Sequence, residues 1–270
     1  MAEAFRRYAG AATRATRCGL APRPRRLLRF AAAVVTALLL IVASVEWAIV
    51  LSSALGHAGT VGLDYGIYRD RTRSWIAGDG FYLPRQLHGP YDVQPGDALY
   101  PPVVLVLLVP FTVMPAPLWW VLPVALLATG LWRCRPAWWA WPLIAAAAAY
   151  PRTIQAVLFG NPSIWAFALV AAGAAWGVLG PFVVLKPTLA PFALVGLRCP
   201  RAMLRGVAVV LLLGALFAPM WPDYSHVLLD ARAGAGYGLA YTLGEWPTAL
   251  ALAVACWSGG ASGTPPRSDN

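Results

Sequence analysis

Two charged residues lie where this apolar sequence can hardly accommodate charge. Asp64 follows the first long apolar run, and Lys186, the only lysine in the chain, lies inside the apolar stretch from Phe182 to Leu189. A carboxylate that is ionised at neutral pH can act as a general base toward a hydroxyl group. A cation at membrane depth must face a cavity, a partner acid or an anionic ligand. We therefore interpret Asp64 and Lys186 as candidate site residues.

Both residues also have an ordinary structural interpretation. Asp64 could be a helix N-cap or a solvated loop acid, and its spacing alone favours that interpretation. Lys186 could extend its ammonium to the membrane interface. However, Pro187 follows Lys186 directly, and a broken helix that lines a site is a natural setting for a lysine beside a proline. For Lys186 we therefore favour the functional interpretation.

The composition predicts an integral membrane protein. Of the 270 residues, 59% are apolar and 12% are charged, and the mean hydropathy is +0.62. A soluble domain carries about 25% charged residues, so an ordinary water-soluble enzyme is excluded. The four cysteines are far apart, and the three histidines lack metal-ligand spacing. We therefore expect no metal, disulfide framework or cofactor.

The charge distribution predicts the orientation in the membrane. Residues 1–29 hold eight arginines against Glu3 alone, which is typical of a cytoplasmic N-terminal arm. Only Phe5 and Tyr8 are aromatic among these arginines, so we expect contact with anionic lipid and not with nucleic acid. The 21 residues from Phe30 to Val50 carry only one charge, that of Glu46. This length is enough to span the membrane, and we expect a retained anchor helix that runs from the cytoplasm to the outside. Glu46 could lie at the interface, or pair with Lys186 or an external arginine.

The predicted fold is all-α, a polytopic transmembrane protein of about seven crossings with one broken helix. Residues 98–132 are uncharged and rich in proline, so they form either one bent crossing with a lead-in or two short crossings joined at Met114 to Pro117. The expected division is a basic cytoplasmic arm (1–29), a transmembrane domain (30–257) and a compositionally disordered tail (258–270). The external loops are expected at about 57–100 and 221–245, and the further passes at 137–150, 163–178, 206–220 and 246–257. The half-helices meet at Lys186-Pro187, and the protein is expected in the plasma membrane.

Polar and aromatic residues of the external segments complete the set of candidates. Tyr68 and Tyr100 belong to an aromatic first loop, whose rings could anchor at the interface or stack on sugar faces. Asn161, in a Gly-Asn-Pro-Ser turn, would present an amide at a helix start, where capping is the default explanation. The sequence has no Walker loop, no GxGxxG and no zinc signature. The sequence therefore shows no residues that could build a nucleotide-binding site on the cytoplasmic side.

Five short motifs together resemble a known family. In chain order they are Asp-x-x-x-Tyr (64–68), Gly-Asp-Gly-Phe-Tyr (78–82), Tyr-Pro-Pro (100–102), Gly-Asn (160–161) and Lys-Pro-Thr (186–188). Their order and spacing, from about Arg29 to Arg205, resemble glycosyltransferase family 87. These C-type, polytopic enzymes include the mannosyltransferases that make phosphatidylinositol mannosides in mycobacterial envelopes.

The resemblance implies a function for each candidate residue. Asp64 matches the aspartate taken to be the base that activates the acceptor hydroxyl, and Lys186 matches a basic residue that could neutralise the donor phosphate. Tyr68, Tyr100 and Asn161 match positions around the site. The implied donor is a polyprenyl-phosphate sugar, and the acceptor is a lipid or a glycan. Family members are usually longer, so an inactive truncated relative is an alternative, as is a non-enzymatic transporter or envelope assembly factor.

Overall fold

The structure is a computed structural model that describes residues 22–56, 61–94, 96–232 and 243–259. Most of the basic arm, part of the second external loop and the 260–270 tail lie outside the described residues. The described chain is mostly helical, and its two strands are only two residues long each. The all-α prediction is therefore confirmed.

The first membrane helix is longer than predicted. Helix α2 (Pro22–Gly56) extends beyond both ends of the expected Phe30–Val50 segment, and its part Pro24–Ser53 is long and apolar enough to cross a membrane. It packs along α7 (Trp141–Ala149), where the Trp47 indole donates to the Ala148 carbonyl at 3.3 Å. Most of its remaining apolar side chains are exposed, as expected for a helix that faces lipid.

By length and composition, one helix in the described part of the chain can cross a membrane. The number rises to three if each of two bent helix pairs counts as one span. In these pairs, the two helices are long and apolar enough only in combination. They are α8 (Pro151–Phe159) with α9 (Ser163–Trp176), bent by 113°, and α10 (Pro200–Leu216) with the segment Ala218–Leu229, bent by 73°. The latter holds η6 (Ala218–Met220) and α11 (Trp221–Leu229). The other apolar helices are shorter than the roughly 20 residues of an upright span. Seven crossings are therefore not confirmed.

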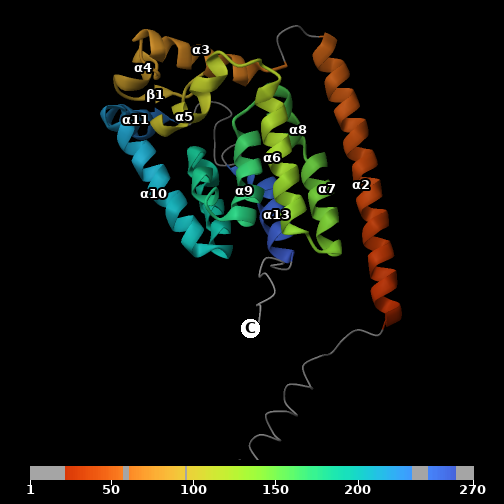
Figure 1. Ribbon diagram of the computed structural model, residues 1–270. Helices are drawn as coiled ribbons and strands as arrows, with labels where there is room; N and C mark the ends of the chain where they lie inside the picture. The colour runs from red at the N-terminus through yellow and green to blue at the C-terminus, as the bar shows by residue number, and fades with distance from the viewer. Residues whose placement is uncertain (1–21, 57–60, 95, 233–242, 260–270) are drawn as a thin grey trace, which may run out of the picture.

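The core is a bundle centred on α9 (Figure 1). Helices α6 (Leu118–Cys134) and α13 (Trp246–Ser258) pack against it, and α13 also contacts α7. Small residues allow this close packing, because a Cβ at Gly130 of α6 would lie 2.9 Å from the Ala171 backbone. Eleven residues of α9 are buried. Between α6 and α7, η3 (Trp138–Ala140) adds a short 3₁₀ turn.

The segment around Lys186 is broken, as the sequence predicts. Two 3₁₀ helices, η4 (Gly180–Leu185) and η5 (Pro187–Arg198), pack against each other, and Lys186 lies between them with an extended backbone. Glycines allow the close approach, since a Cβ at Gly173 would lie 2.6 Å from the Gly180 Cα. The two half-helices therefore form a hairpin with Lys186 at its turn.

The predicted first external loop is largely folded. It contains α3 (Leu63–Ala77), α4 (Pro84–Leu87) and β1 (Tyr91–Asp92), and β1 pairs in parallel with β2 (Ala231–Arg232). The Tyr91 hydroxyl donates to the Val227 carbonyl at 2.8 Å, which joins β1 to α11. An ion pair between the partly exposed Arg85 and the buried Asp97 also stabilises the loop. This folded layer positions α3 over the bundle.

The uncharged stretch 98–132 divides into a lead-in and one long helix. The lead-in comprises η1 (Pro102–Val104), α5 (Leu105–Leu108) and η2 (Val109–Thr112), and α6 follows after the break at 113–117. Eleven helical residues extend roughly 17–22 Å, which is too short for a hydrocarbon core of about 30 Å. The break coincides with the joint expected at Met114 to Pro117, and the number of crossings in this stretch stays a prediction.

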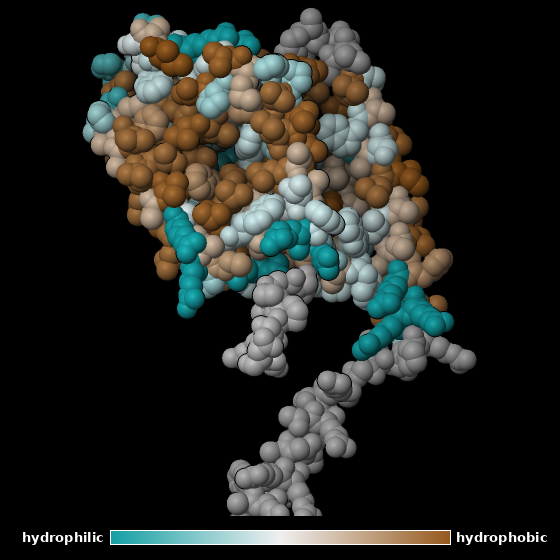
Figure 2. All heavy atoms as spheres, in the orientation of Figure 1, coloured by the Kyte–Doolittle hydropathy of each residue, from teal (hydrophilic) through white to brown (hydrophobic). Residues whose placement is uncertain are grey.

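The surface has the polarity of a membrane protein. Figure 2 shows a broad hydrophobic band between hydrophilic residues at the two ends of the molecule. The helix ends opposite α3 and α4 in Figure 1 carry the arginines that begin α2, end α6 and begin α10: Arg25, Arg26, Arg29, Arg133, Arg135, Arg201 and Arg205. The candidate residue Asp64 lies at the other end, on α3.

Candidate functional site

Asp64 lies in the first turn of α3 and is not the N-cap, a position that Gly62 occupies. The Gly62 N–H donates to the Leu158 carbonyl at 2.9 Å and so attaches the start of α3 to α8. The neighbouring Tyr65 ring packs 5.4 Å from Trp119 and its hydroxyl bonds to the Phe111 carbonyl. Asp64 is therefore positioned by contacts on both sides of the helix start.

Asn161 connects Asp64 to the interior of the bundle. Gly160 ends α8 with a φ of 67°, so the chain turns and Asn161 faces the start of α3. The Asn161 Nδ2 donates to Asp64 Oδ2 at 2.6 Å, and its Oδ1 accepts from the Ser163 N–H at 3.0 Å. Only this orientation of the amide satisfies both neighbours, since a carboxylate accepts and an N–H donates.

Lys186 has a complete set of acceptors around its ammonium. Its Nζ lies 2.9 Å from both carboxylate oxygens of Glu245 and 3.1 Å from Asn161 Oδ1. The Ser163 hydroxyl is in contact with the same ammonium, and the Tyr100 hydroxyl is 3.4 Å away. Lys186 is buried, so the interpretation that it reaches solvent at an interface does not describe this structure.

The two candidate tyrosines flank the same cluster. The Tyr100 hydroxyl lies 3.5 Å from Asn161 Oδ1, and its ring centroid lies 5.7 Å from Lys186 Nζ. The Tyr68 ring, one helical turn after Asp64, meets Tyr100 edge to face at 5.1 Å. All five candidate residues, which come from four separate segments, thus lie together in one continuous cluster.

Sequence reasoning missed two members of this cluster, Glu245 and Ser163. Glu245 directly precedes α13, where Trp246 holds it in place by donating to the Thr188 carbonyl at 2.8 Å. The usable signal was that Glu245 is the last acid before the final apolar helix. Glu46, which the sequence analysis left open as a partner of Lys186, does not contact it. Its Oε2 is buried and has no hydrogen-bond partner among the described residues.

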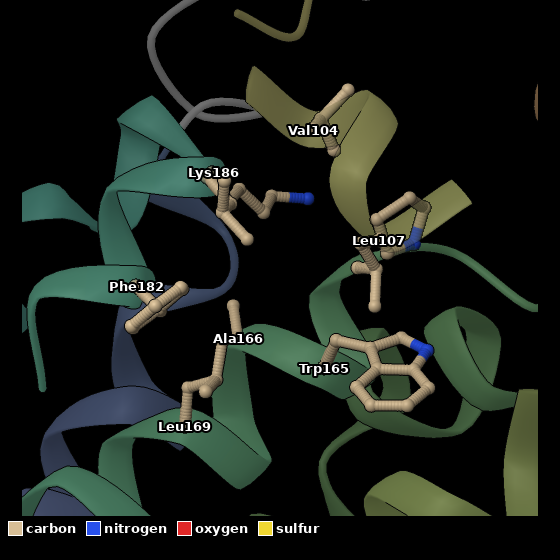
Figure 3. A pocket seen from close by; sticks show the side chains of 9 residues that line it. Val104, Leu107, Trp165, Ala166, Leu169, Phe182 and Lys186 are labelled. Carbon is tan, nitrogen blue, oxygen red and sulfur yellow. The ribbon is translucent and has the colours of Figure 1, made fainter. Parts of the chain in front are cut away.

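A narrow apolar cleft reaches the Lys186 side chain (Figure 3). Its empty volume is about 230 Å³, including the part that opens outward, and apolar side chains from α5, α9 and η4 line it. Lys186 is the only charged residue among the nine that line the cleft. In Figure 3 its ammonium points across the cleft toward the side of Val104 and Leu107. The cleft therefore has an apolar wall and one cationic end.

The electrostatics of Asp64 suit a carboxylate at the edge of an apolar region. Burial raises the pKa of Asp64 above its ordinary value, and the negative charge of Glu245 raises it further. The hydrogen bond from Asn161 and the charge of Lys186 lower the pKa of Asp64 and partly offset this effect. A carboxylate with a raised pKa is a stronger base than a solvated aspartate. No cluster of three or more potential metal ligands occurs in the described segments.

Comparison with known proteins identifies no relative of this chain: no family model, no curated protein and no solved structure matches it.

Proposed function

We propose that this chain is an integral membrane glycosyltransferase that transfers a sugar from a polyprenyl-phosphate donor to a hydroxyl group on a lipid or glycan. The observation that carries the proposal is one amide, Asn161, bonded both to the carboxylate of Asp64 and to the ammonium of Lys186. Such a pairing provides a base and an anion-binding cation at one site. The resemblance to glycosyltransferase family 87 supports the same assignment.

The proposed reaction uses each of these groups once. Asp64 accepts the proton of the acceptor hydroxyl as the hydroxyl oxygen attacks the anomeric carbon of the donor sugar. The bond between that carbon and the phosphate oxygen breaks, and the lipid phosphate leaves with its electron pair. Lys186 stabilises the negative charge of the departing phosphate. A single displacement of this kind inverts the configuration at the anomeric carbon.

The proposed donor matches the chemical character of the cleft beside Lys186. A polyprenyl phosphate has an anionic head joined to an apolar chain, and the cleft joins a cation to an apolar wall. Tyr68 and Tyr100 contribute rings near Asp64, where they could stack on the sugar. No cofactor is needed for this chemistry, because the donor already carries its leaving group.

The proposed topology places the site on the external face of the plasma membrane. The N-terminus is cytoplasmic, and the arginines of α2, α6 and α10 mark the same side by the positive-inside rule. We propose that α6, α7, α9 and α13 cross with α2 and α10, and that η4 and η5 form the broken helix, which gives about seven crossings. An external site must take its sugar from a lipid carrier, since nucleotide sugars remain in the cytoplasm.

Mass spectrometry of lipid-linked sugars and envelope glycolipids tests the proposal. Membranes with the wild-type chain, incubated with polyprenyl-phosphate sugars, should gain a product heavier by one hexose, and membranes with Asp64→Asn should not. An equal product in both membranes would remove Asp64 from the reaction. No product in either membrane would favour the alternative of a transporter, an assembly factor or an inactive relative.

A further inference from the structure

The ion pair between Lys186 and Glu245 occupies the position that an anionic ligand of Lys186 would need. Both Glu245 carboxylate oxygens lie 2.9 Å from Nζ. An ammonium has three donors, and the three nearest acceptors are Glu245, Ser163 and Asn161. The Tyr100 hydroxyl is more distant, at 3.4 Å. A phosphate can therefore reach Lys186 only if one of these three acceptors leaves.

Two of the three acceptors are fixed by other bonds. Asn161 is held by Asp64 on one side and by the Ser163 N–H on the other. Ser163 belongs to the buried first turn of α9. Glu245 also contacts the Ser163 hydroxyl, but it precedes α13 and its side chain is 16% exposed. Glu245 is thus the acceptor that can move toward solvent with the least disturbance.

Charge also selects Glu245 as the group to be exchanged. Among the described residues, it is the only acid that forms an ion pair with Lys186. A buried cation is stable with one anionic partner, whereas a phosphate and two carboxylates around a single ammonium would leave several negative charges uncompensated. Exchange of the Glu245 carboxylate for a phosphate preserves the charge balance of the buried cation.

We propose that Glu245 is a counter-ion latch: it holds Lys186 while the site is empty and is displaced by the phosphate head of the lipid ligand. The inference rests on the proposed function, since it takes a lipid-borne phosphate to be the ligand of Lys186. Glu245 is then a positioning residue that sets how tightly the phosphate binds. Its removal strengthens binding, which is opposite to the effect expected of a residue that contacts the ligand favourably.

Direct binding to the full chain in nanodiscs tests the latch. The probes are a polyprenyl monophosphate without sugar, the corresponding neutral polyprenol, and inorganic phosphate. Glu245→Gln should bind the polyprenyl monophosphate at least fivefold more tightly than the wild type, with no gain for the polyprenol. The control Asp79→Asn makes the same carboxylate-to-amide change at an exposed loop residue, and should stay within twofold of the wild type. Unchanged or weaker binding by Glu245→Gln overturns the latch.

Further variants separate failure of the latch from failure of the proposed function. Lys186→Gln should lose binding of the polyprenyl monophosphate in the wild-type and Glu245→Gln backgrounds alike. Retained binding in Lys186→Gln contradicts the use of Lys186 in both proposals. Binding that depends on Lys186 but is insensitive to Glu245 overturns the latch alone. Inorganic phosphate that binds as tightly as the lipid would show that the headgroup alone is recognised, and would contradict a lipid ligand.

A labelling experiment on the wild type avoids reliance on a folded Glu245 variant. A water-soluble carbodiimide at mildly acidic pH reacts faster with solvent-accessible carboxyl groups than with a carboxylate held in a buried ion pair, and peptide mass spectrometry locates the product. Saturation with polyprenyl monophosphate should raise the labelling of Glu245 severalfold and leave that of Asp79 unchanged. Equal labelling of Glu245 with and without the lipid overturns the displacement.

Discussion

Asn161 donates a hydrogen bond of 2.6 Å to Asp64, although the two residues are 97 positions apart in the chain. The bond joins the end of α8 to the start of α3, and the same amide accepts from Lys186 at 3.1 Å. One side chain therefore couples the proposed base to the proposed anion-binding residue. The coupling makes the properties of each of these residues depend on the others.

Asp64→Asn should abolish sugar transfer while the protein still folds. The amide oxygen of an asparagine can still accept from Asn161, so only the capacity to take up a proton is lost. General base catalysis contributes roughly 10²- to 10⁴-fold to rate, and we expect a fall of that order in kcat with little change in donor affinity. The measurement is transfer of a radiolabelled sugar by purified protein in liposomes.

Asp70→Asn is the matched control for Asp64→Asn. Asp70 lies on the same helix and pairs only at the surface, with Arg69 and Arg73. Exposed ion pairs contribute about 0–1 kcal/mol, so transfer by this variant should equal that of the wild type. Equal losses in the two variants would point to a general effect of charge on α3 and not to catalysis by Asp64.

The pH dependence of transfer should move in opposite directions in two variants. The acidic limb of the profile reports ionisation of Asp64, and it should lie above the ordinary aspartate value because burial raises the pKa of Asp64. Asn161→Ala removes a hydrogen bond that lowers this pKa, so the limb should shift to higher pH. Glu245→Gln removes a negative charge that raises the pKa of Asp64, so the acidic limb should shift to lower pH. Shifts of the same sign would contradict the assignment of the limb to Asp64.

The raised pKa of Asp64 also has a consequence for stability. Ionisation of Asp64 is less favourable in the folded chain than in the unfolded chain. The contribution of this group to stability is therefore greatest below its unfolded pKa of about 3.8, and it falls as the pH rises through the folded pKa. Asp64→Asn should remove this part of the pH dependence. Unfolding titrations of both proteins across the acidic range measure it.

Lys186→Met should destabilise the protein more than the double substitution Lys186→Met/Glu245→Gln. Loss of Lys186 leaves the largely buried Glu245 carboxylate without its cation, and breaking a buried pair in this way costs about 3–5 kcal/mol. The double variant leaves no unpaired charge and should recover most of this loss. Unfolding in mixed detergent micelles provides the comparison, and an additive double variant would show that the pair is not coupled.

Gly160→Ala should destabilise the turn that presents Asn161. The residue has a φ of 67°, and a Cβ there would lie 2.8 Å from the Trp120 ring and 2.9 Å from Tyr65 Cβ. Strain of this kind costs about 1–3 kcal/mol, and a displaced Asn161 should also reduce transfer. Gly66→Ala is the control, since it has open space around its Cβ within α3. Alanine there should be neutral or stabilising.

The break of the helix at Lys186 was predictable, whereas the partner of Lys186 was not. The dipeptide Lys186-Pro187 disrupts an apolar segment by local rules, since proline lacks an N–H. The pairing with Glu245 spans 59 positions and depends on how α13 packs, which periodicity does not encode. Helix α8 was missed, because no element was expected between the passes 137–150 and 163–178. Pro151 at its first position and Gly160 after its end are nevertheless local signals of a helix.

The final prediction concerns the apolar cleft and the length of the donor lipid. Leu107 lies on the wall of the cleft across from Lys186 (Figure 3), and it is only partly buried, so a larger side chain can be accommodated there. Leu107→Trp should narrow the cleft and raise the KM for a donor with a long polyprenyl chain by about tenfold, which corresponds to about 1.4 kcal/mol. A donor with only two isoprene units should be affected less, because its chain fills less of the cleft.

Leu122→Trp provides the control for the cleft. Leu122 is exposed on α6, outside the residues that line the cleft, so the same change in volume should leave both KM values near those of the wild type. A rise in KM that is equal for long and short donors in Leu107→Trp would place the effect at the headgroup and argue against chain binding along this wall. A rise confined to the long donor, with kcat retained, would identify the cleft as the path of the lipid because only contacts with the chain would have been lost.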